Sequence, residues 1–464
     1  MYYCLADRFV LRGWEKLPTG LVDRVSGSAI FLEPNLYTKL CDLGWMLFEG
    51  SPFITPEEAE TLARLEELRV LELCDHARPL TEDQTYRSYP NRYLREVHWA
   101  ITGACNCRCR HCYLSAPSRE IREYSYRECE EIIDQMEAAG IASVSLTGGE
   151  ALIRSDFLKI AERLTDAGIR ISTIMSNGLL VGRTLLESLQ DMGQKPQFNM
   201  SFDGIGTHDW LRGIEGAERR VLRAFEFCAE YGFSTAAEYC LHRDNVCVLR
   251  QSIRLLGSLG CEYLKVNGLS PEGEALGILD HVLSTEEEYQ CYLDYLPDFY
   301  EDDEPLQLIL SGMFASYGDK KADIPYVRMS EDADCDNFCL CGHARSYMYL
   351  TEEGYIVPCI PMGSTEAGKR HFPNIRDTSL SDAIKDSFYM SFIDTRLRTY
   401  FDAHPECAAC EYRNRCGGGC RGNAVSTGGI MGRDEKSCAF FRGGFYDRVK
   451  ALLRDLGVSL EREV

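Results

Sequence analysis

Three cysteines in the stretch T-G-A-C-N-C-R-C-R-H-C-Y, residues 102–113, have the residue type and the spacing to hold an iron–sulfur cluster. Three residues separate Cys105 from Cys109, and two separate Cys109 from Cys112. A cubane 4Fe-4S cluster normally takes four thiolates, so three would leave one iron open to another ligand. A zinc site that lacks one ligand is an alternative. A chance cluster is another, because 22 of the 464 residues are cysteines.

The composition describes a globular protein of more than one domain that is too acidic to bind nucleic acid. Hydrophobic residues make up 45% of the chain, and the net charge is −22. Nucleic-acid-binding surfaces are basic, and no lysine and arginine cluster in the sequence is dense enough. We expect neither a signal peptide nor a membrane span, because the N-terminus lacks a basic stretch followed by an apolar one. A cytoplasmic protein follows, in which cysteines are more often metal ligands than disulfides.

Residues 96–268 alternate between short apolar runs typical of strands and longer amphipathic stretches typical of helices. This alternation indicates an α/β fold, in which helices cover a parallel sheet. Six strands favour an open, partial (β/α) barrel over a closed barrel of eight. The expected strands are residues 96–102, 143–147, 170–175, 197–202, 235–241 and 263–266.

Small or polar residues mark the ends of the first four expected strands. In chain order these are the cysteine motif, then Gly148-Gly149-Glu150, then Ser176-Asn177, then Ser201 and Asp203. Parallel barrels carry their sites at the carboxyl ends of the strands, so all four groups are expected on one rim. An ordinary turn explains each glycine pair taken alone, but it explains poorly why four such groups coincide with strand ends.

The segment resembles the radical S-adenosylmethionine (SAM) enzymes, because the three-cysteine loop is followed by the Gly-Gly-Glu turn. The resemblance implies that a 4Fe-4S cluster is held by Cys105, Cys109 and Cys112 and that Cys107 is not a ligand. It also implies the chemistry of that family. An electron from the cluster cleaves SAM, and the resulting 5′-deoxyadenosyl radical abstracts hydrogen from a substrate.

The same resemblance implies where SAM would bind. Gly148, Gly149 and Glu150 would hold its methionine amino group, and Tyr113 would lie near its adenine. Arg212, in the stretch H-D-W-L-R-G, is a candidate ligand of its carboxylate. The positions that match ligands of the ribose or the carboxylate are Ser176, Asn177, Ser201 and Asp203.

A second cysteine pattern occupies the C-terminal third of the chain. Its densest part is C-A-A-C-E-Y-R-N-R-C-G-G-G-C, which contains Cys407, Cys410, Cys416 and Cys420. Cys341 and Cys359 precede this run, and Cys438 follows it. Chance explains such a run poorly. A Cys4 zinc site is the alternative, but it would leave several of these cysteines without a role.

The order of these cysteines is similar to the SPASM extension of radical SAM enzymes. The resemblance implies two auxiliary 4Fe-4S clusters, and so three clusters in all, with ligands that interleave along the chain. One auxiliary cluster would be held by Cys407, Cys410, Cys416 and Cys438. The other would be held by Cys341, Cys359 and Cys420, with Cys335 as the fourth ligand and Cys339 as a competitor for that position.

Four parts of the chain are expected from these patterns. Residues 1–90 form a small α+β N-terminal domain that resembles the leader-peptide recognition domain of ribosomal-peptide maturases, although a structural cap on the barrel is an alternative. Residues 91–270 form the radical SAM partial barrel. Residues 271–330 form a helical bridge, and residues 331–464 form the cysteine-rich SPASM domain.

The resemblance implies an oxidoreductase that acts on a ribosomally synthesised precursor peptide with a leader and forms a thioether or another side-chain crosslink. Sulfatase-maturase-type oxidation is an alternative, but that group places an acid where Ile360 follows Cys359. Peptide epimerisation is a further alternative, and an iron–sulfur electron carrier or a leader-binding scaffold is the non-enzymatic one. The expected partners are the peptide and a flavodoxin- or ferredoxin-like electron donor, without nucleic acid or membrane.

Overall fold

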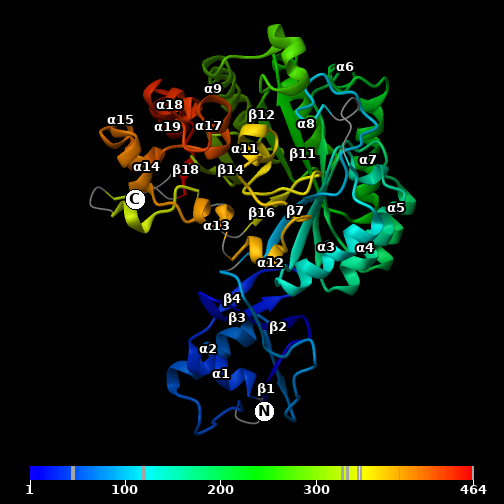
Figure 1. Ribbon diagram of the computed structural model, residues 1–464, viewed down its shortest axis with the longest axis vertical. Helices are drawn as coiled ribbons and strands as arrows, with labels where there is room; N and C mark the ends of the chain where they lie inside the picture. The colour runs from blue at the N-terminus through cyan, green and yellow to red at the C-terminus, as the bar shows by residue number, and fades with distance from the viewer. Residues whose placement is uncertain are drawn as a thin grey trace.

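The computed structural model describes residues 1–42, 47–92, 94–115, 122–325, 329–330, 334–341, 344, 347–385 and 387–461. In Figure 1 a small N-terminal unit lies at one end of the long axis, below a large body of strands and helices, and the C-terminal helices pack beside that body. Among the described residues, no helix combines the length and the apolar composition needed to cross a membrane.

A twelve-stranded sheet forms the centre of the molecule. Its strands, in spatial order, are β17 (Ile356–Val357), β16 (Tyr347–Leu350), β7 (Glu96–Ala100), β8 (Ser143–Thr147), β9 (Arg170–Ser176), β10 (Gln197–Ser201), β11 (Thr235–Leu241), β12 (Tyr263–Gly268), β13 (Gln307–Leu310), β14 (Phe314–Gly318), β15 (Lys321–Asp323) and β18 (Ser459–Leu460). Neighbouring strands are parallel from β16 to β13. The expected α/β architecture with a large, mostly parallel sheet is therefore confirmed.

The parallel run is longer than the six strands expected from the sequence. The expected strands correspond to β7–β12, and the run continues into β16 at one edge and β13 at the other. Both added strands are only four residues long and lie outside the alternating segment. Their pairing is decided by the sheet edges that they join, and a short apolar run does not reveal such pairing.

Amphipathic helices cover the outer face of the parallel strands (Figure 1). They are α3 (Tyr126–Ala138), α4 (Phe157–Asp166), α5 (Arg183–Asp191), α7 (Ala217–Tyr231) and α8 (Leu249–Ser258). A capping box starts α3, in which the Ser125 side chain accepts from the backbone N–H of Glu128 and the Glu128 side chain accepts from that of Ser125. Ile133, Ile160 and Leu186 point toward the sheet and are completely buried, so these helices close the core of the barrel.

The N-terminal residues have a sheet and a hydrophobic core of their own. The four-stranded sheet has the order β4 (Ala29–Phe31), β3 (Leu17–Asp23), β2 (Phe9–Trp14) and β6 (Arg87–Tyr89). A second pair joins β1 (Tyr2–Leu5) to β5 (Leu71–Cys74), and the helices are α1 (Pro34–Cys41) and α2 (Pro56–Glu67). The core contains Leu11, Leu21, Leu36 and Leu62.

This N-terminal sheet contacts the barrel where β8 and β9 begin, at the end of the strands opposite to the cysteine motif. Arg95 donates to the carbonyl of Gly27, and Arg170 Nη2 donates to the carbonyl of Ser26 at 3.2 Å. Gly140 precedes β8 and has a φ of +76°, and a Cβ there would lie 2.3 Å from the ring of Tyr89. The close approach of Tyr89 to the barrel therefore requires a glycine.

The segment 271–330 is not a purely helical bridge. It contains a 3-10 segment, η3 (Gly273–His281), and one long helix, α9 (Thr285–Glu301), followed by the three strands β13–β15 of the central sheet. In α9, the buried carboxylate of Glu288 pairs with Lys436 Nζ at 2.8 Å. The segment thus extends the barrel sheet and ties it to the C-terminal part.

The C-terminal part consists mainly of short helices. They are α10 (Ile360–Gly363), α11 (Glu366–Lys369), α12 (Leu380–Ala383), α13 (Phe388–Ile393), α14 (Leu397–Ala403), α15 (Pro405–Ala408), α16 (Arg413–Cys416), α17 (Arg421–Gly428), α18 (Glu435–Arg442) and α19 (Phe445–Asp455). Short helices contribute little stability of their own, so this part depends on packing and on whatever its cysteines bind.

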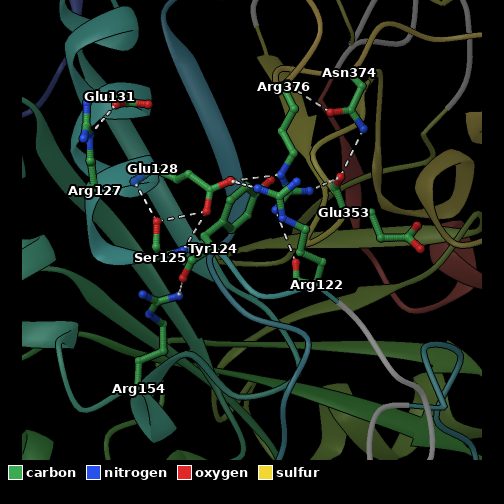
Figure 2. A network of polar contacts seen from close by, with 10 residues as sticks. All are labelled: Arg122, Tyr124, Ser125, Arg127, Glu128, Glu131, Arg154, Glu353, Asn374 and Arg376. Carbon is green, nitrogen blue, oxygen red and sulfur yellow. Dashed lines mark hydrogen bonds and ion pairs between the residues drawn. The ribbon is translucent and has the colours of Figure 1, made fainter.

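A polar network joins the C-terminal part to the barrel just after the cysteine motif (Figure 2). Arg376 Nε donates to Glu128 Oε1 at 3.2 Å, and Arg376 Nη1 donates to the carbonyl of Glu353 at 2.6 Å. The Arg376 guanidinium also lies 4.6 Å from the ring centre of Tyr124. Glu128 therefore caps α3 and anchors the C-terminal part at the same time.

Candidate active site

The cysteine loop, residues 101–115, follows β7 and is fixed against the short helix α6 (His208–Arg212). The backbone N–H of Arg108 donates to the carbonyl of Arg212 at 3.1 Å, and that of Arg110 donates to the carbonyl of Leu211 at 2.8 Å. Gly213 has a φ of +67°, and a Cβ there would lie 2.3 Å from the Arg108 carbonyl oxygen. The loop is thus positioned by the end of α6, about a hundred residues later in the chain.

Two thiols of this loop, those of Cys105 and Cys109, have lowered pKa values. Cys107 is 2% exposed, and its backbone N–H donates to Cys105 Sγ at 3.4 Å. Hydrogen bonding with the Cys107 thiol lowers the pKa of Cys105. The same interaction, together with the charge of Arg212, lowers the pKa of Cys109 to about 6. Thiolate is the form that binds metal, so the loop fits a metal or an iron–sulfur cluster.

Two glycines let the Gly-Gly-Glu turn lie directly against the start of the cysteine loop. The N–H of Gly149 donates to the carbonyl of Thr102, and the N–H of Glu150 donates to that of Ala104, both at 2.9 Å. A Cβ at Gly149 would lie 2.4 Å from the Ala104 oxygen, and one at Gly148 would lie 2.3 Å from the Thr102 oxygen. Larger residues would push the turn and the loop apart.

Glu150 holds the ends of β8 and β9 together. Its side chain is 1% exposed and accepts from Ser176 Oγ at 3.0 Å, from the N–H of Asn177 at 2.7 Å and from that of Leu152 at 3.1 Å. Burial raises the pKa of Glu150, and these hydrogen bonds oppose the rise. Asn177 Nδ2 in turn donates to Asn106 Oδ1 in the cysteine loop at 2.7 Å. The strand ends and the loop therefore form one bonded unit.

Asp203 and Arg212 form a buried ion pair beside the loop. Arg212 Nε donates to Asp203 Oδ2 at 2.7 Å, and Arg212 Nη1 lies 3.7 Å from Cys109 Sγ. Burial alone would raise the pKa of Asp203, but the charge of Arg212 holds it well below its usual value. Asp203 Oδ1 accepts from the N–H of Cys240 at 3.0 Å. Both carboxylate oxygens of Asp203 therefore have partners inside the protein, and Arg212 connects Asp203 to the loop.

One cavity of about 200 Å³ brings most of the expected site residues together. Its lining includes Cys105, Cys109, Cys112, Tyr113, Gly148, Gly149, Ser176, Asn177, Ser201 and Arg212. Glu150 and Asp203 stand behind this lining, 1% and 0% exposed. The expected rim at the carboxyl ends of the strands is therefore a real hollow, with two of the expected residues supporting it from behind.

The same cavity is lined by residues that sequence reasoning missed, which include Asn199, Glu238, Met175 and His111. Asn199 Nδ2 donates to Glu238 Oε1 at 3.3 Å. Asn199 lies two positions before Ser201 in β10, so the alternation of a strand puts both on one face and could have identified it. Glu238 is the Cα partner of Ser201 on β11, and only the pairing of the strands reveals this.

Four C-terminal cysteines line a second, smaller cavity of about 30 Å³. They are Cys407, Cys410, Cys416 and Cys438, and they come from α15, α16, α18 and the turn after α15. Arg433 Nη2 donates to Cys438 Sγ at 3.7 Å. An all-sulfur donor set fits an iron–sulfur cluster, and it also fits zinc. Hydrogen bonds to cluster sulfurs tune the potential of a cluster, which gives Arg433 a function in the first case.

Cys341, Cys359 and Cys420 gather where α10 packs against α17. Cys359 directly precedes α10, and Cys420 directly precedes α17. A Cβ at Gly422 would lie 3.6 Å from Cys359 Sγ, so these helices approach closely. Burial raises the pKa of Cys341, and it raises that of Cys359 to about 12, with a further rise in both from the charge of Cys420. A cation or a cluster bound here would favour the thiolate forms of Cys341 and Cys359, which burial alone disfavours.

The two candidates for a fourth ligand have different surroundings. Cys335 packs against the apolar group of Leu397, Tyr400 and Phe401, which Cys407 also contacts. Cys339 accepts from Arg396 Nη1 at 3.2 Å, and its charge affects the pKa of Cys341. Cys335 thus shares its surroundings with the Cys407 group, whereas Cys339 shares them with Cys341.

Comparison with protein-family models identifies two domains in the chain. Residues 99–256 match the radical SAM superfamily, and residues 339–411 match the SPASM iron–sulfur cluster-binding domain. The chain therefore contains a radical SAM domain followed by a SPASM domain. The first match contains the cysteine loop and the Gly-Gly-Glu turn, and the second contains Cys339, Cys341, Cys359, Cys407 and Cys410.

The curated proteins that this chain is similar to have different activities in their names. The AdoMet-dependent heme synthase of Oleidesulfovibrio alaskensis is 25% identical over 75% of this chain and 87% of its own length. The mycofactocin maturase MftC of Mycolicibacterium smegmatis is 26% identical over 73% of this chain and 81% of its own. The structure of Streptococcus suis SuiB bound to the precursor peptide SuiA covers 94% of this chain and 99% of that one, with a TM-score of 0.66. At 15% identity, that likeness concerns the fold alone.

Proposed function

We propose that this enzyme modifies a ribosomally synthesised precursor peptide that carries a leader. The observation that carries the proposal is the union of three parts in one chain: a cavity lined by the three-cysteine loop, a SPASM region and an N-terminal sheet with an open edge. Among the relatives, the mycofactocin maturase and a PqqA peptide cyclase of Granulibacter bethesdensis, 24% identical, support a peptide. An open sheet edge favours a peptide over a planar small molecule, because an extended peptide can pair with it.

The first cavity would hold a 4Fe-4S cluster and SAM. The cluster ligands would be Cys105, Cys109 and Cys112, whose thiol chemistry fits. The SAM-binding residues would be Tyr113, Gly148, Gly149, Ser176, Asn177, Ser201 and Arg212, and Glu150 and Asp203 would support this set from behind. Cluster and SAM together supply a 5′-deoxyadenosyl radical that abstracts hydrogen from carbon. The chain's own residues bind and orient: Glu150 holds the strand ends, and Arg212 balances the charge of Cys109.

The C-terminal part would hold two auxiliary 4Fe-4S clusters. Cys407, Cys410, Cys416 and Cys438 fit one of them, because they line a single cavity. Cys341, Cys359 and Cys420 fit the other. For its fourth ligand we propose Cys339 in place of Cys335. The charge of Cys339 raises the pKa of Cys341, and Cys339 Sγ accepts a hydrogen bond from the guanidinium of Arg396. Fully ligated clusters suit electron transfer.

Residues 1–90 would recognise the leader through strand β4. Among the described strands, β4 pairs only with β3, whereas the other edge strand, β6, ends at Tyr89 against the barrel. The N-terminal sheet contacts the amino ends of the barrel strands, and the cavity lies at their carboxyl ends. Leader binding and chemistry would therefore take place at opposite ends of the barrel. The other proposed parts of the chain are the partial barrel at 91–270, the bridge at 271–330 and the SPASM domain at 331–464.

The proposed reaction is an oxidative crosslink in the peptide, a thioether or another side-chain bond. The residue after Cys359 is Ile360, so the acid that would act as a base in sulfatase-maturase-type oxidation is missing there. Epimerisation needs a thiol that can give hydrogen to the substrate. The Cys107 thiol is buried and hydrogen-bonded to the thiols of Cys105 and Cys109, which disfavours it as the hydrogen donor.

The test uses the anaerobically reconstituted protein with SAM, titanium(III) citrate and the precursor peptide encoded beside its gene. We expect 5′-deoxyadenosine and a peptide that is lighter by two hydrogens in the mass spectrum. A peptide of unchanged mass, together with consumption of an iron porphyrin supplied in parallel, would replace the proposal by a porphyrin activity. Absence of 5′-deoxyadenosine under all conditions would refute SAM cleavage altogether.

A further inference from the structure

Two histidines and an aspartate meet beside the carboxyl end of β11. His242 directly follows β11, Asp244 lies two positions later, and His281 is the last residue of η3. One nitrogen or oxygen atom from each side chain lies within 4.8 Å of those of the other two. We name this set the His–Asp–His group. No motif in the sequence indicates it, because His281 comes 37 residues after Asp244.

The distances within the His–Asp–His group are close to those around a metal ion. His281 Nδ1 lies 2.5 Å from Asp244 Oδ2, and His242 Nδ1 lies 3.6 Å from the same oxygen. Bonds of about 2.0–2.2 Å to a tetrahedral ion place neighbouring ligand atoms about 3–3.5 Å apart. The side chains of Asp244 and His281 are 51% and 35% exposed, so both have room to make this small adjustment.

The imidazole of His242 is fixed in place inside the protein. Its side chain is 0% exposed, and its Nδ1 accepts from the backbone N–H of Asp244 at 3.3 Å. Its Nε2 is buried and has no hydrogen-bond partner among the residues that the structure describes. The ring of Trp210 lies 5.4 Å from that of His242 and 4.7 Å from that of His281. One indole ring thus packs against both imidazoles and limits their rotation, which favours binding of an ion by a preformed site.

Charge distinguishes the His–Asp–His group from a second group with similar spacing. In the described part of the chain, His111, Asp203 and Cys240 also lie within 4.8 Å of one another. Asp203 already pairs with Arg212 at 2.7 Å, so an ion there would have to displace a buried cation. Asp244, in contrast, forms ion pairs only with the two histidines among the described residues. Its negative charge is therefore available to a metal ion.

The segment η3 depends on contacts at its two ends. At its start, the N–H of Glu274 donates to the carbonyl of Cys112 at 3.0 Å. At its end, the N–H of Arg243 donates to the carbonyl of His281 at 3.0 Å. Runs of 3-10 helix longer than three or four residues are uncommon, and η3 has nine residues with non-helical backbone angles at Ile278. Its own hydrogen bonds therefore hold it weakly.

We propose that His242, Asp244 and His281 bind a divalent transition-metal ion, zinc, that fastens η3 to the end of β11. Imidazole and carboxylate together suit zinc, whereas calcium and magnesium prefer oxygen ligands alone. Three protein ligands leave a position for water on the exposed side. Because η3 starts against Cys112, the ion would also stabilise the outer side of the cysteine loop. The inference does not depend on the proposed peptide activity.

The test measures zinc in the full chain after anaerobic reconstitution of its clusters and dialysis against micromolar zinc chloride. We expect one bound zinc whose X-ray absorption at the zinc edge shows nitrogen and oxygen neighbours at about 2.0–2.1 Å and no sulfur. His281→Ala and Asp244→Asn change partly exposed side chains, so both proteins should fold. Each should weaken zinc binding about a hundredfold or more, since loss of a residue that only supports a ligand already costs about 10–100-fold.

Two control variants distinguish the His–Asp–His group from other binding positions. His371→Ala removes an exposed histidine elsewhere in the chain. Cys247→Ser removes the rival thiol, because Cys247 is exposed and its Sγ donates to the carbonyl of Asp244 at 3.7 Å. Both controls should bind zinc like the wild type. Sulfur around the zinc, or loss of the ion in Cys247→Ser, would overturn the proposal in favour of a thiol site.

Hydrogen exchange tests the effect of the ion on η3. In the wild type, zinc should slow exchange of the backbone amides of residues 273–281 about tenfold or more, because the bound state must open before they exchange. In His281→Ala it should not. Equal zinc content in the wild type and both site variants, or a wild type that binds no zinc, would overturn the site. Zinc bound by these residues without slower exchange would overturn its role in fastening η3.

Discussion

Arg212 connects two parts of the site that lie 103 residues apart in the chain. Its guanidinium pairs with Asp203 at 2.7 Å and approaches Cys109 Sγ at 3.7 Å. The cation favours the thiolate form of Cys109 and the ionised form of Asp203, both of which are costly to bury alone. At the residue scale the site therefore depends on a charge balance inside the protein, which must exist before any cofactor binds.

Arg212→Ala should destabilise the cluster-free protein by about 3–5 kcal/mol, because Asp203 would remain as an unpaired buried charge. Arg183→Ala is the control: the Arg183–Glu230 pair is 49% exposed on both sides and should cost about 0–1 kcal/mol. Urea unfolding of both variants at pH 7 measures the two values. Equal shifts of the urea midpoint would show that the buried Asp203–Arg212 pair contributes no more to stability than the exposed Arg183–Glu230 pair.

The pH dependence of that stability has a definite sign. The folded pKa of Asp203 is far below its unfolded value, so its contribution is fully present above the unfolded pKa of about 4 and is lost as the pH falls toward the folded pKa. The difference between wild type and Arg212→Ala should therefore shrink in acid as Asp203 protonates, and it should grow above pH 6, because Arg212 also lowers the pKa of Cys109.

Gly149→Ala should separate the Gly-Gly-Glu turn from the cysteine loop. The new Cβ would meet the carbonyl oxygen of Ala104 at 2.4 Å, and backbone atoms on both sides have little freedom to move. Overpacking of this kind costs about 1–3 kcal/mol, so we expect the affinity for SAM to fall about tenfold or more. Gly182→Ala is the control, since a Cβ at Gly182 meets nothing within 4 Å. Equilibrium SAM binding that is equal in both variants would contradict this account of the turn.

At the scale of the elements, strand β4 has a free side that the proposed function uses. Between β3 and β4, the N–H of Leu32 donates to the carbonyl of Thr19, and the N–H of Asp23 donates to the carbonyl of Ser28. Antiparallel pairs alternate along a ladder. With Leu21 opposite Ile30, the N–H group of Ala29 points away from β3. An added peptide strand would pair with this group.

Ala29→Pro should weaken binding of the precursor peptide and leave SAM binding unchanged. Proline removes the outward N–H without removing a bond to β3, and edge strands tolerate proline. The loss of one or two backbone hydrogen bonds should lower the affinity about tenfold. Ala29→Val keeps the N–H and should bind like the wild type. Fluorescence anisotropy of a labelled leader measures both, and an unaffected Ala29→Pro protein would exclude β4 as the binding edge.

At the scale of the whole molecule, two groups of cysteines lie in separate segments of the chain, and the fold connects the elements around them. The cysteine loop follows β7, and the C-terminal cysteines surround β16 and the helices after it. Strand β16 pairs directly with β7, and the Arg376 network of Figure 2 adds a second connection. The two groups are therefore held in one body, although each has its own cavity and should fill independently.

Cys410→Ala and Cys105→Ala should lose different parts of the function. Cys410→Ala should lower the iron content by one cluster and stop formation of modified peptide while SAM cleavage continues. Cys105→Ala should abolish SAM cleavage and leave the absorbance of the auxiliary clusters. Iron analysis, 5′-deoxyadenosine yield and peptide mass distinguish the two cases. Wild-type product from Cys410→Ala would remove the case for a required cluster at that cavity.

Much of this protein was determined by local sequence. The apolar alternation in residues 96–268 fixed an α/β sheet with outer helices, because burial on a strand or helix face follows the local period of the chain. The cysteine spacings and the Gly-Gly-Glu turn indicated the family, since a loop of fixed length must supply its ligands from nearby positions. Ten of the expected pocket residues line one cavity, because they lie at or beyond the carboxyl ends of strands in the same parallel sheet.

Only the tertiary structure decided what depends on segments far apart in the chain. It paired β16 with β7 and extended the sheet beyond β12. It placed Glu238 beside Ser201 and paired Asp203 with Arg212. These features are set by strand pairing and charge balance across the core, which a local pattern does not encode, because neither partner carries information about where the other will lie.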